Sequence, residues 1–256
     1  MAKRLGGSTD PGRALALLWG VQRVPRRGPR QSLSVEEIVG VAIELADADG
    51  LEALSMRRVA ERFGVNAMAL YTYVPGKAEL VDLMLDAVLG EAARPDGTEG
   101  GWRAGLELYA REAWALYLRH PWALRVPYSR GFMGPNQAAA LDSALRAVSG
   151  IGLSRREMVA VFGVVAGYVQ GVARTSAEAA QTERATGVTD DEWWSVYGPL
   201  MAEYIDRDRY PTLASISAEE WVFEEAEGGG FEFGLRCVLD GIETYVKSRS
   251  SQSDQR

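Results

Sequence analysis

Two adjoining stretches of the chain decide its fold: residues 50–65 read GLEALSMRRVAERFGV and residues 70–80 read LYTYVPGKAEL. In the first stretch Ser55 can cap a short helix, with apolar side chains on one face and charged side chains on the other. Gly64 ends that helix, and Asn66 can cap a further short helix only two residues later. Two short helices around a tight glycine turn are typical of a helix-turn-helix.

Helices on both sides of this motif complete a small domain. Ser34 precedes Glu37 by three residues, which is the spacing of a capping box, so we expect the first helix to begin there. The helix capped by Asn66 is predicted over residues 67–73, and a fourth helix follows from Lys77. The polar, glycine-rich run 94–101 predicts the end of this domain.

The chain beyond this run is predicted to form a larger helical domain, residues 95–248. Apolar residues recur there with helical spacing, and turns containing proline or glycine separate the helices. The predicted helices cover about residues 102–119, 135–149, 155–184, 190–206, 217–226 and 231–248. No pattern of a strand ladder is found. The polar residues 249–256 are predicted to be a disordered tail.

The cysteine and histidine counts exclude two kinds of site. The single cysteine, Cys237, excludes an intramolecular disulfide, and the single histidine, His120, leaves too few ligands for a Cys/His zinc site. We therefore expect no metal and no cofactor. We expect His120, which precedes a proline, to end a helix.

The net charge of -7 is distributed unevenly along the chain. Residues 1–34 contain seven lysines and arginines and a single acidic residue. Residues 1–32 are therefore predicted to be a basic arm. Two interpretations remain open: such an arm binds nucleic-acid phosphates, or it is a solubilising tail.

Two apolar runs bear on localisation. Residues 14–21, ALALLWGV, follow basic residues as in a signal peptide, but no small-residue cleavage site comes after them. This run is instead a candidate for an extra helix docked on the domain. Residues 158–173 are shorter than the ~20 residues that a bilayer span needs, and they contain Gln170. We expect a cytoplasmic protein that contacts no membrane.

Residues 33–90 closely resemble the DNA-binding domain of the TetR family, and the pattern LYxYVxxKxEL in residues 70–80 is the specific part. The remainder is similar only in architecture, and looks like actinobacterial members that share the C-terminal domain type of the Tet repressor. The resemblance implies an all-α fold: an N-terminal three-helix helix-turn-helix domain, residues 33–94, and a larger helical ligand-binding and dimerisation domain. It implies three partners: operator double-stranded DNA, a small-molecule effector and a second copy of the chain.

Side-chain chemistry and the resemblance together give candidate DNA contacts. Arg57 matches a family position that reaches guanine, whose two acceptors suit arginine. Asn66 can bind an adenine edge, unless it serves only as a helix cap, and Ala67 and Met68 offer apolar contact. The complete set of candidates is Arg26, Arg27, Arg30, Ser55, Arg57, Asn66, Ala67, Met68, Tyr71, Thr72, Tyr73 and Lys77.

Ser55, Tyr71, Tyr73 and Lys77 match positions that contact phosphate in the family. Lys77 opens a helix, where a cation opposes the helix dipole, and a bound phosphate would relieve the conflict. The alternatives are that Lys77 is an exposed lysine without function and that at least one tyrosine ring packs on the first helix. The three arginines of segment 24–30 are expected to enter the minor groove, because two prolines and a glycine keep the segment extended.

The larger domain contains most of the tryptophan, which suggests an aromatic effector pocket. The candidates are Trp114, Tyr117, Trp122, Phe132, Phe162, Trp193, Trp194 and Tyr197, each of which could instead belong to the core. For dimerisation the candidates are Gly163, Gly167 and Gly171, which repeat every fourth residue and permit close helix approach, and Leu235, Val238, Leu239, Ile242 and Tyr245. Family architecture pairs these two helices with their symmetry mates. The alternative is packing within one chain.

The function predicted from these features is a ligand-responsive repressor, released from its operator by a small aromatic or antibiotic-like molecule. One alternative is a ligand-independent DNA-binding or architectural protein, which the basic arm favours and the aromatic-rich domain opposes. A second alternative is an enzyme with an aromatic pocket. We expect no enzyme, because neither a nucleophile elbow nor a phosphate-binding glycine loop is found.

Overall fold

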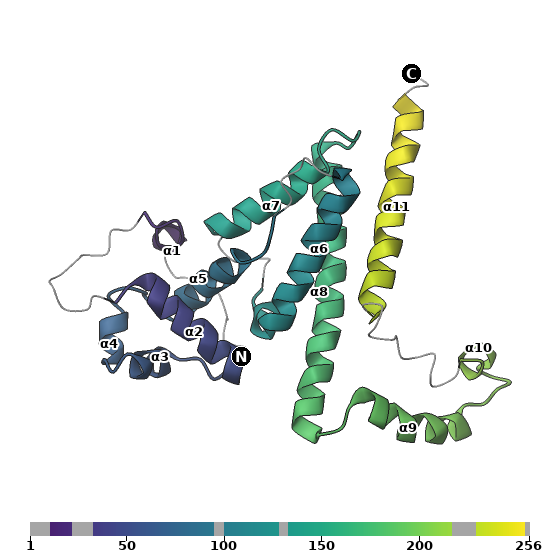
Figure 1. Ribbon diagram of the computed structural model, residues 1–256, viewed down its shortest axis with the longest axis horizontal. Coiled ribbons are helices and arrows are strands. Elements are labelled where there is room, and N and C mark those ends of the chain that lie inside the picture. The colour runs from purple at the N-terminus through teal and green to yellow at the C-terminus, as the bar shows by residue number, and fades with distance from the viewer. Residues whose placement is uncertain (1–10, 22–32, 95–99, 128–132, 217–228, 254–256) are drawn as a thin grey trace.

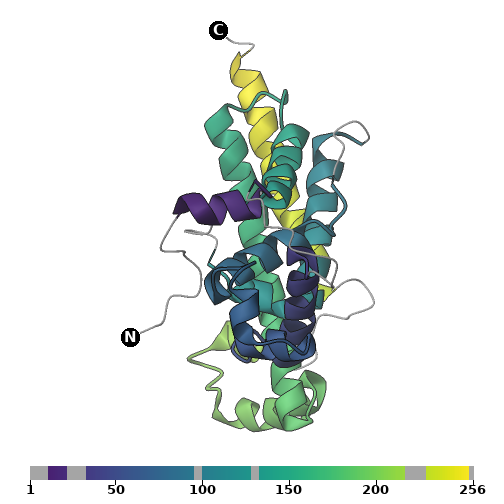
Figure 2. The ribbon, with the colours of Figure 1, turned by 90° about the vertical axis from the view of Figure 1, so that its left-hand side faces the viewer.

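The computed structural model describes residues 11–21, 33–94, 100–127, 133–216 and 229–253, and over these ranges every regular element is a helix (Figure 1). The predicted all-α fold is therefore confirmed. A small N-terminal group of helices packs against one side of a larger helical domain, from which α9 and α10 project at the end opposite the C-terminus (Figures 1 and 2).

The small domain contains α2 (Val35–Asp49), α3 (Met56–Arg62), α4 (Ala67–Leu70) and α5 (Lys77–Leu89). Three side-chain caps set their starts. Ser34 and Glu37 form the predicted capping box, the Ser55 hydroxyl accepts from the Arg58 amide, and the Asn66 side chain accepts from the Met68 amide. The predicted helix 67–73 is shorter, because α4 ends at Leu70 and continues as a turn.

The apolar run after Arg13 forms an additional helix, α1 (Pro11–Leu18), which packs on α5. Its side chains Ala14, Leu17 and Leu18 are buried. The indole N–H of Trp19 donates to the carbonyl oxygen of Met133 at 3.1 Å, just before α7. The segment predicted to be a basic arm thus contains a docked helix, and α1 joins the small domain to the larger one.

The larger domain is built on α6 (Gly101–Arg119), the 3-10 turn η1 (Pro121–Arg125), α7 (Pro135–Ala147), α8 (Arg155–Thr186) and α11 (Gly229–Ser253). Helix α8 packs on both α6 and α11. Its length and composition would allow it to cross a membrane, which is weak evidence for a span in a helix with this packing. Two further helices, α9 (Asp190–Tyr204) and α10 (Pro211–Ala214), bury no residue.

The structure departs from one expectation for the C-terminal part and does not describe the residues of another. The helix predicted at residues 217–226 lies outside the described residues. The predicted disordered tail is wrong at its start, because α11 continues to Ser253. Helical propensity and packing of the preceding turns carry the helix through a polar sequence that has no glycine or proline to stop it.

Two polar clusters join the small domain to the larger one. Asp86 of α5 lies at the N-terminus of α7, where it accepts from the Gln137 amide at 3.0 Å and from the Asn136 amide at 3.3 Å. His120, which ends α6 as predicted, contacts Asp47 of α2 at 2.8 Å through Nδ1. The second ring nitrogen, Nε2, lies 3.3 Å from Glu91, just beyond α5.

Candidate nucleic-acid interface and ligand cavity

The exposed surface of α3 and α4 carries most of the candidate DNA-reading side chains. Arg57, in the first turn of α3, has a side chain that is 85% exposed and pairs with Glu61 of the next turn, at 2.8 Å. That partner raises the pKa of the guanidinium through a hydrogen bond and its charge. Met68 is 70% exposed on α4 beside Ala67. An exposed i,i+4 pair is weak enough for Arg57 to exchange its partner for a base edge.

The structure separates Arg57 from its neighbour Arg58. The guanidinium of Arg58 donates to the Ala53 carbonyl oxygen at 3.1 Å and pairs with Asp49 at 2.5 Å. Arg58 therefore holds the end of α2 against the start of α3. This agrees with Arg57, rather than Arg58, as the candidate for base contact.

Several predicted phosphate contacts have roles within the chain. The ammonium of Lys77 donates to the Leu51 carbonyl oxygen at 2.9 Å, and so ties the start of α5 to the turn after α2. The ring of Tyr73 packs against the apolar core, as expected for one of the two tyrosines, whereas Tyr71 is 41% exposed. The hydroxyl of Thr72 donates to the Ala69 carbonyl oxygen at 2.7 Å. Arg26, Arg27 and Arg30 lie outside the described residues.

A cavity of about 210 Å³ lies between the end of α5 and three helices of the larger domain. Each helix contributes residues spaced by three or four positions, so that one face of each points inward. The lining residues are Leu89, Ala92, Ala93 and Arg94 at the end of α5; Tyr109, Glu112, Ala113, Leu116 and Tyr117 from α6; Gln137, Ala140 and Leu141 from α7; and Phe162, Ala166 and Gln170 from α8.

Alanines and aromatic rings give the cavity apolar walls. The rings of Tyr109 and Phe162 meet at a centroid distance of 5.2 Å and an angle of 52°. Burial and the neighbouring Tyr117 raise the pKa of the Tyr109 hydroxyl, which stays protonated and can donate a hydrogen bond. Glu112 supplies a carboxylate, whose Oε2 accepts from the Ala93 amide at 2.9 Å. An apolar cavity with a few polar groups suits a small organic ligand.

Only part of the predicted aromatic pocket lines this cavity. Tyr117 and Phe162 do, whereas Phe132 lies outside the described residues. Trp114 instead stacks on Phe231 of α11, with ring centroids 4.3 Å apart. Trp122 is buried between the domains and donates to Asp47 at 2.7 Å.

The aromatic residues of α9 also lie away from the cavity. Trp193 stacks on Tyr197 at 4.2 Å, and Trp194 meets both rings edge-on. These three side chains belong to a helix without buried residues, and they do not line the cavity. The structure of the single chain therefore does not support them as part of the effector pocket. Sequence reasoning missed Tyr109 and Glu112, although their spacing from Leu116 and Tyr117 on one helical face could have indicated them.

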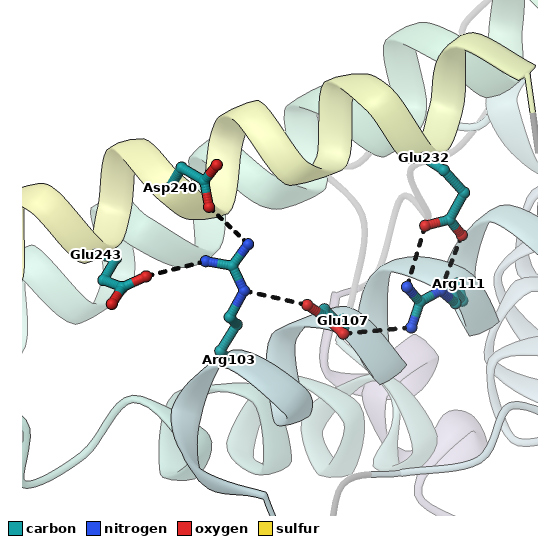
Figure 3. A network of polar contacts seen from close by, with 6 residues as sticks. All are labelled: Arg103, Glu107, Arg111, Glu232, Asp240 and Glu243. Carbon is teal, nitrogen blue, oxygen red and sulfur yellow. Dashed lines mark hydrogen bonds and ion pairs between the residues drawn. The ribbon is translucent and has the colours of Figure 1, made fainter.

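Polar contacts hold α6 to α11 on the side away from the cavity (Figure 3). Arg103 of α6 reaches Asp240 at 2.7 Å and Glu243 at 3.2 Å, both on α11. About two turns further along α6, Arg111 makes two hydrogen bonds to Glu232 of α11, at 2.9 and 3.0 Å. Helix α6 therefore presents one face to the cavity and another to α11.

The predicted dimer residues divide into two groups. Leu235, Leu239 and Ile242 are buried in the chain's own core, because this stripe of α11 faces α6 and α8; for these three residues the structure favours the alternative of packing within one chain. Val238 packs against the same core, and the Tyr245 hydroxyl donates to Glu157 at 2.6 Å.

The glycine face of α8 is open. Gly163, Gly167 and Gly171 are exposed, and a Cβ atom built on any of them would meet nothing within 4 Å. Val159 and Val164 beside them are 57% and 55% exposed. A glycine in a helix interior costs about 1 kcal/mol relative to alanine, and no contact among the residues that the structure describes explains three of them at this spacing.

Comparisons with known proteins agree with these features. Residues 38–84 match the family model "Bacterial regulatory proteins, tetR family", and residues 94–246 match "Tetracyclin repressor-like, C-terminal domain". The HTH-type transcriptional repressor DrrR1 of Streptomyces coeruleorubidus is 44% identical over 251 residues, which are 96% of this chain and 91% of that protein.

Solved structures share the fold. ActR, a TetR family protein of Streptomyces coelicolor, in complex with (S)-DNPA matches with a TM-score of 0.70 and 22% identity, over 84% of this chain and 98% of that one. ActR in complex with actinorhodin matches with a TM-score of 0.65 and 24% identity, over 82% and 94%.

The family resemblance, the predicted helix-turn-helix and the expectation of a regulator rather than an enzyme are confirmed by the two family models and by the similar repressor. The chain is a DNA-binding transcriptional regulator with a ligand-binding type of C-terminal domain. It belongs to the TetR family of bacterial regulatory proteins.

Proposed function

We propose that this chain is a homodimeric, cytoplasmic repressor that leaves its operator when a small, largely apolar aromatic molecule enters the cavity. The observation that carries this proposal is that α5 runs from the helix-turn-helix to the cavity. The helix begins at Lys77, tied to Leu51 next to the helix-turn-helix, and ends at Leu89, in the wall of the cavity. A ligand that displaces the cavity wall therefore acts on the helix that packs against α2, and α2 packs in turn on α3.

The similar proteins support both halves of this proposal. The 44% identical relative bears the name of a transcriptional repressor, and ActR was solved with two small molecules, (S)-DNPA and actinorhodin. A ligand that favours a conformer with misaligned DNA-binding domains lowers operator affinity by its differential binding to the two conformers.

The test uses the DNA upstream of the coding sequence in a gel shift, with and without candidate aromatic effectors. Ala166→Trp fills the cavity from α8 and should retain DNA binding but lose the response to effector. Ala185→Trp, at an exposed position of the same helix, is the matched control and should respond like the unmodified protein. A response that survives in Ala166→Trp contradicts effector binding in this cavity.

For DNA recognition we propose base contact by Arg57 and by the α4 residues Asn66, Ala67 and Met68, phosphate contact by Ser55, Tyr71, Thr72, Tyr73 and Lys77, and minor-groove contact by Arg26, Arg27 and Arg30. Removal of residues 1–30 should weaken operator binding and flatten its salt dependence, because phosphate neutralisation releases counterions. A variant with the three arm arginines changed to alanine keeps α1 and isolates the charge. Unchanged affinity and salt slope in that variant would exclude the arm from the interface.

For dimerisation we propose that α8 meets its symmetry mate through Gly163, Gly167 and Gly171, and that accessible side chains of α11 extend the contact. Phe233, 56% exposed, and Tyr245, 44% exposed, are two large side chains of α11 that stay accessible in the single chain. The exposed apolar side chains of α9 are further candidates for contact with the second copy. Gly167→Arg should yield monomers in analytical ultracentrifugation, whereas Ala185→Arg should leave the dimer intact; a dimeric Gly167→Arg protein contradicts the assignment.

A further inference from the structure

The cavity contains a carboxylate without a counter-ion in the described part of the chain. Glu112 of α6 lines the cavity, and its Oε2 accepts one hydrogen bond from the Ala93 amide. Among the residues that the structure describes, no lysine or arginine forms an ion pair with it. The backbone hydrogen bond fixes the side chain and leaves the other carboxylate oxygen available to a ligand.

The cavity lining also contains a positively charged side chain, Arg94. Arg94 lies at the exposed end of the lining and donates to the Asn136 side chain at 3.0 Å. Its guanidinium is thus engaged across the gap between the end of α5 and the start of α7. Among the described residues its hydrogen-bond partner is Asn136, and it forms no ion pair with Glu112.

The surroundings of Glu112 favour a positive charge on the ligand. When a ligand fills an apolar cavity it removes water from the carboxylate, and an uncompensated buried charge is costly. The rings of Tyr109, Tyr117 and Phe162 line the cavity, and aromatic rings can attract a cation through their π electrons. Tyr109 adds no negative charge of its own, since its hydroxyl stays protonated.

We propose that the effector is an organic cation with a flat aromatic body, and that Glu112 is the group that binds its positive charge. The inference rests on the proposed function in one respect, that the cavity is the effector site. The neutral donors and acceptors in the wall, the hydroxyl of Tyr109 and the side-chain amides of Gln137 and Gln170, then orient the aromatic body.

The test compares two dyes that share a xanthene ring system and differ in charge: rhodamine 6G, a cation, and fluorescein, an anion. Binding of each dye to the full chain is measured by fluorescence anisotropy without DNA. The unmodified protein should bind rhodamine 6G at least about 10-fold more tightly than fluorescein, since a charge-assisted contact contributes about one to two orders of magnitude in affinity. Equal affinity for the two dyes, or no binding of rhodamine 6G, overturns the proposal.

The variant Glu112→Gln retains a carbonyl oxygen for the Ala93 amide and removes only the charge. It should lose about 10- to 100-fold in rhodamine 6G affinity and keep the thermal stability of the unmodified protein. The matched control Glu178→Gln, an exposed position on α8, should bind the dye normally. Unchanged rhodamine 6G affinity in Glu112→Gln also overturns the proposal.

A parallel gel shift separates this inference from the proposed function. If rhodamine 6G binds through Glu112 but operator DNA stays bound, the ligand chemistry stands and effector-driven release fails. If neutral or anionic aromatic molecules release the operator and Glu112→Gln responds equally, release stands and the cationic ligand class fails.

Discussion

Replacement of Asp86 by alanine should destabilise the protein by about 2 to 3 kcal/mol. The carboxylate is buried at the N-terminus of α7, where it accepts from two backbone amides and from the Asn136 side chain, at 3.0 to 3.3 Å. Loss of a helix cap costs about 1 to 2 kcal/mol, and a hydrogen bond to a charged group contributes about 1.5 to 3 kcal/mol. These contributions overlap, so the expected total is smaller than their sum. Gly134 permits this approach, because a Cβ there would lie 2.3 Å from Asp86.

The measurement is urea unfolding followed by circular dichroism, at one protein concentration because a dimer's stability depends on it. Asp142→Ala on α7 is the matched control: it removes an exposed carboxylate paired with Arg146 and gains the same helix propensity. It should change the free energy of unfolding by less than about 0.5 kcal/mol. If Asp86→Ala differs from this control by less than about 0.5 kcal/mol, Asp86 does not stabilise the start of α7.

Three further predictions concern other parts of the chain. Arg57→Ala should weaken operator binding by about 10- to 100-fold in the gel shift, which is the magnitude of a lost bidentate base contact. Arg62→Ala, at an exposed position of the same helix, should have little effect in the same gel shift. Burial, and secondarily the charge of Glu79, raise the pKa of Asp82 to about 6. Because this pKa is above the unfolded value near 4, the native state loses stability as the pH rises from about 4 to 6. Asp82→Asn should therefore stabilise the protein by about 1 to 3 kcal/mol at pH 8 and by much less at pH 4. Urea unfolding at the two pH values measures the difference. Deletion of residues 1–21 uncovers the apolar surface of α5 that Ala14, Leu17 and Leu18 cover, and should lower the free energy of unfolding by about 2 kcal/mol; an unchanged unfolding midpoint would show that α1 contributes nothing to stability.

The starts of the helices could be predicted from the sequence because their causes are local. Ser34, Ser55 and Asn66 each accept a hydrogen bond from an amide two or three residues ahead, so the spacing alone contains the information. The end of α11 could not be predicted in this way, because the helix continues through a polar sequence as a result of the packing of its earlier turns. The docking of α1 depends likewise on a partner surface on α5.

The site was harder to predict because it depends on how helices face one another. Trp114 and Glu112 are two residues apart on α6, yet the tryptophan stacks on α11 and the glutamate lines the cavity. Residue type favoured the tryptophan as a cavity-lining residue, whereas helical spacing from Leu116 favours the glutamate. In the same way, Lys77 matches a phosphate-contacting position of the family but reaches the Leu51 carbonyl oxygen within the chain.

The ties around α5 also limit how strongly the cavity can act on the DNA-binding surface. Just beyond its end, the Ala93 amide binds Glu112 of the cavity wall, and in its last turn Asp86 binds the start of α7, another cavity wall. A third tie joins Glu91 to Asp47 of α2 through His120. An effector that moves α6 or α7 must either carry α5 along or break these hydrogen bonds. Breaking one costs about 1 to 3 kcal/mol, which equals a typical coupling free energy between two sites. Loss of a single tie should therefore weaken the effect of the ligand on operator binding, while the two remaining ties still transmit part of it.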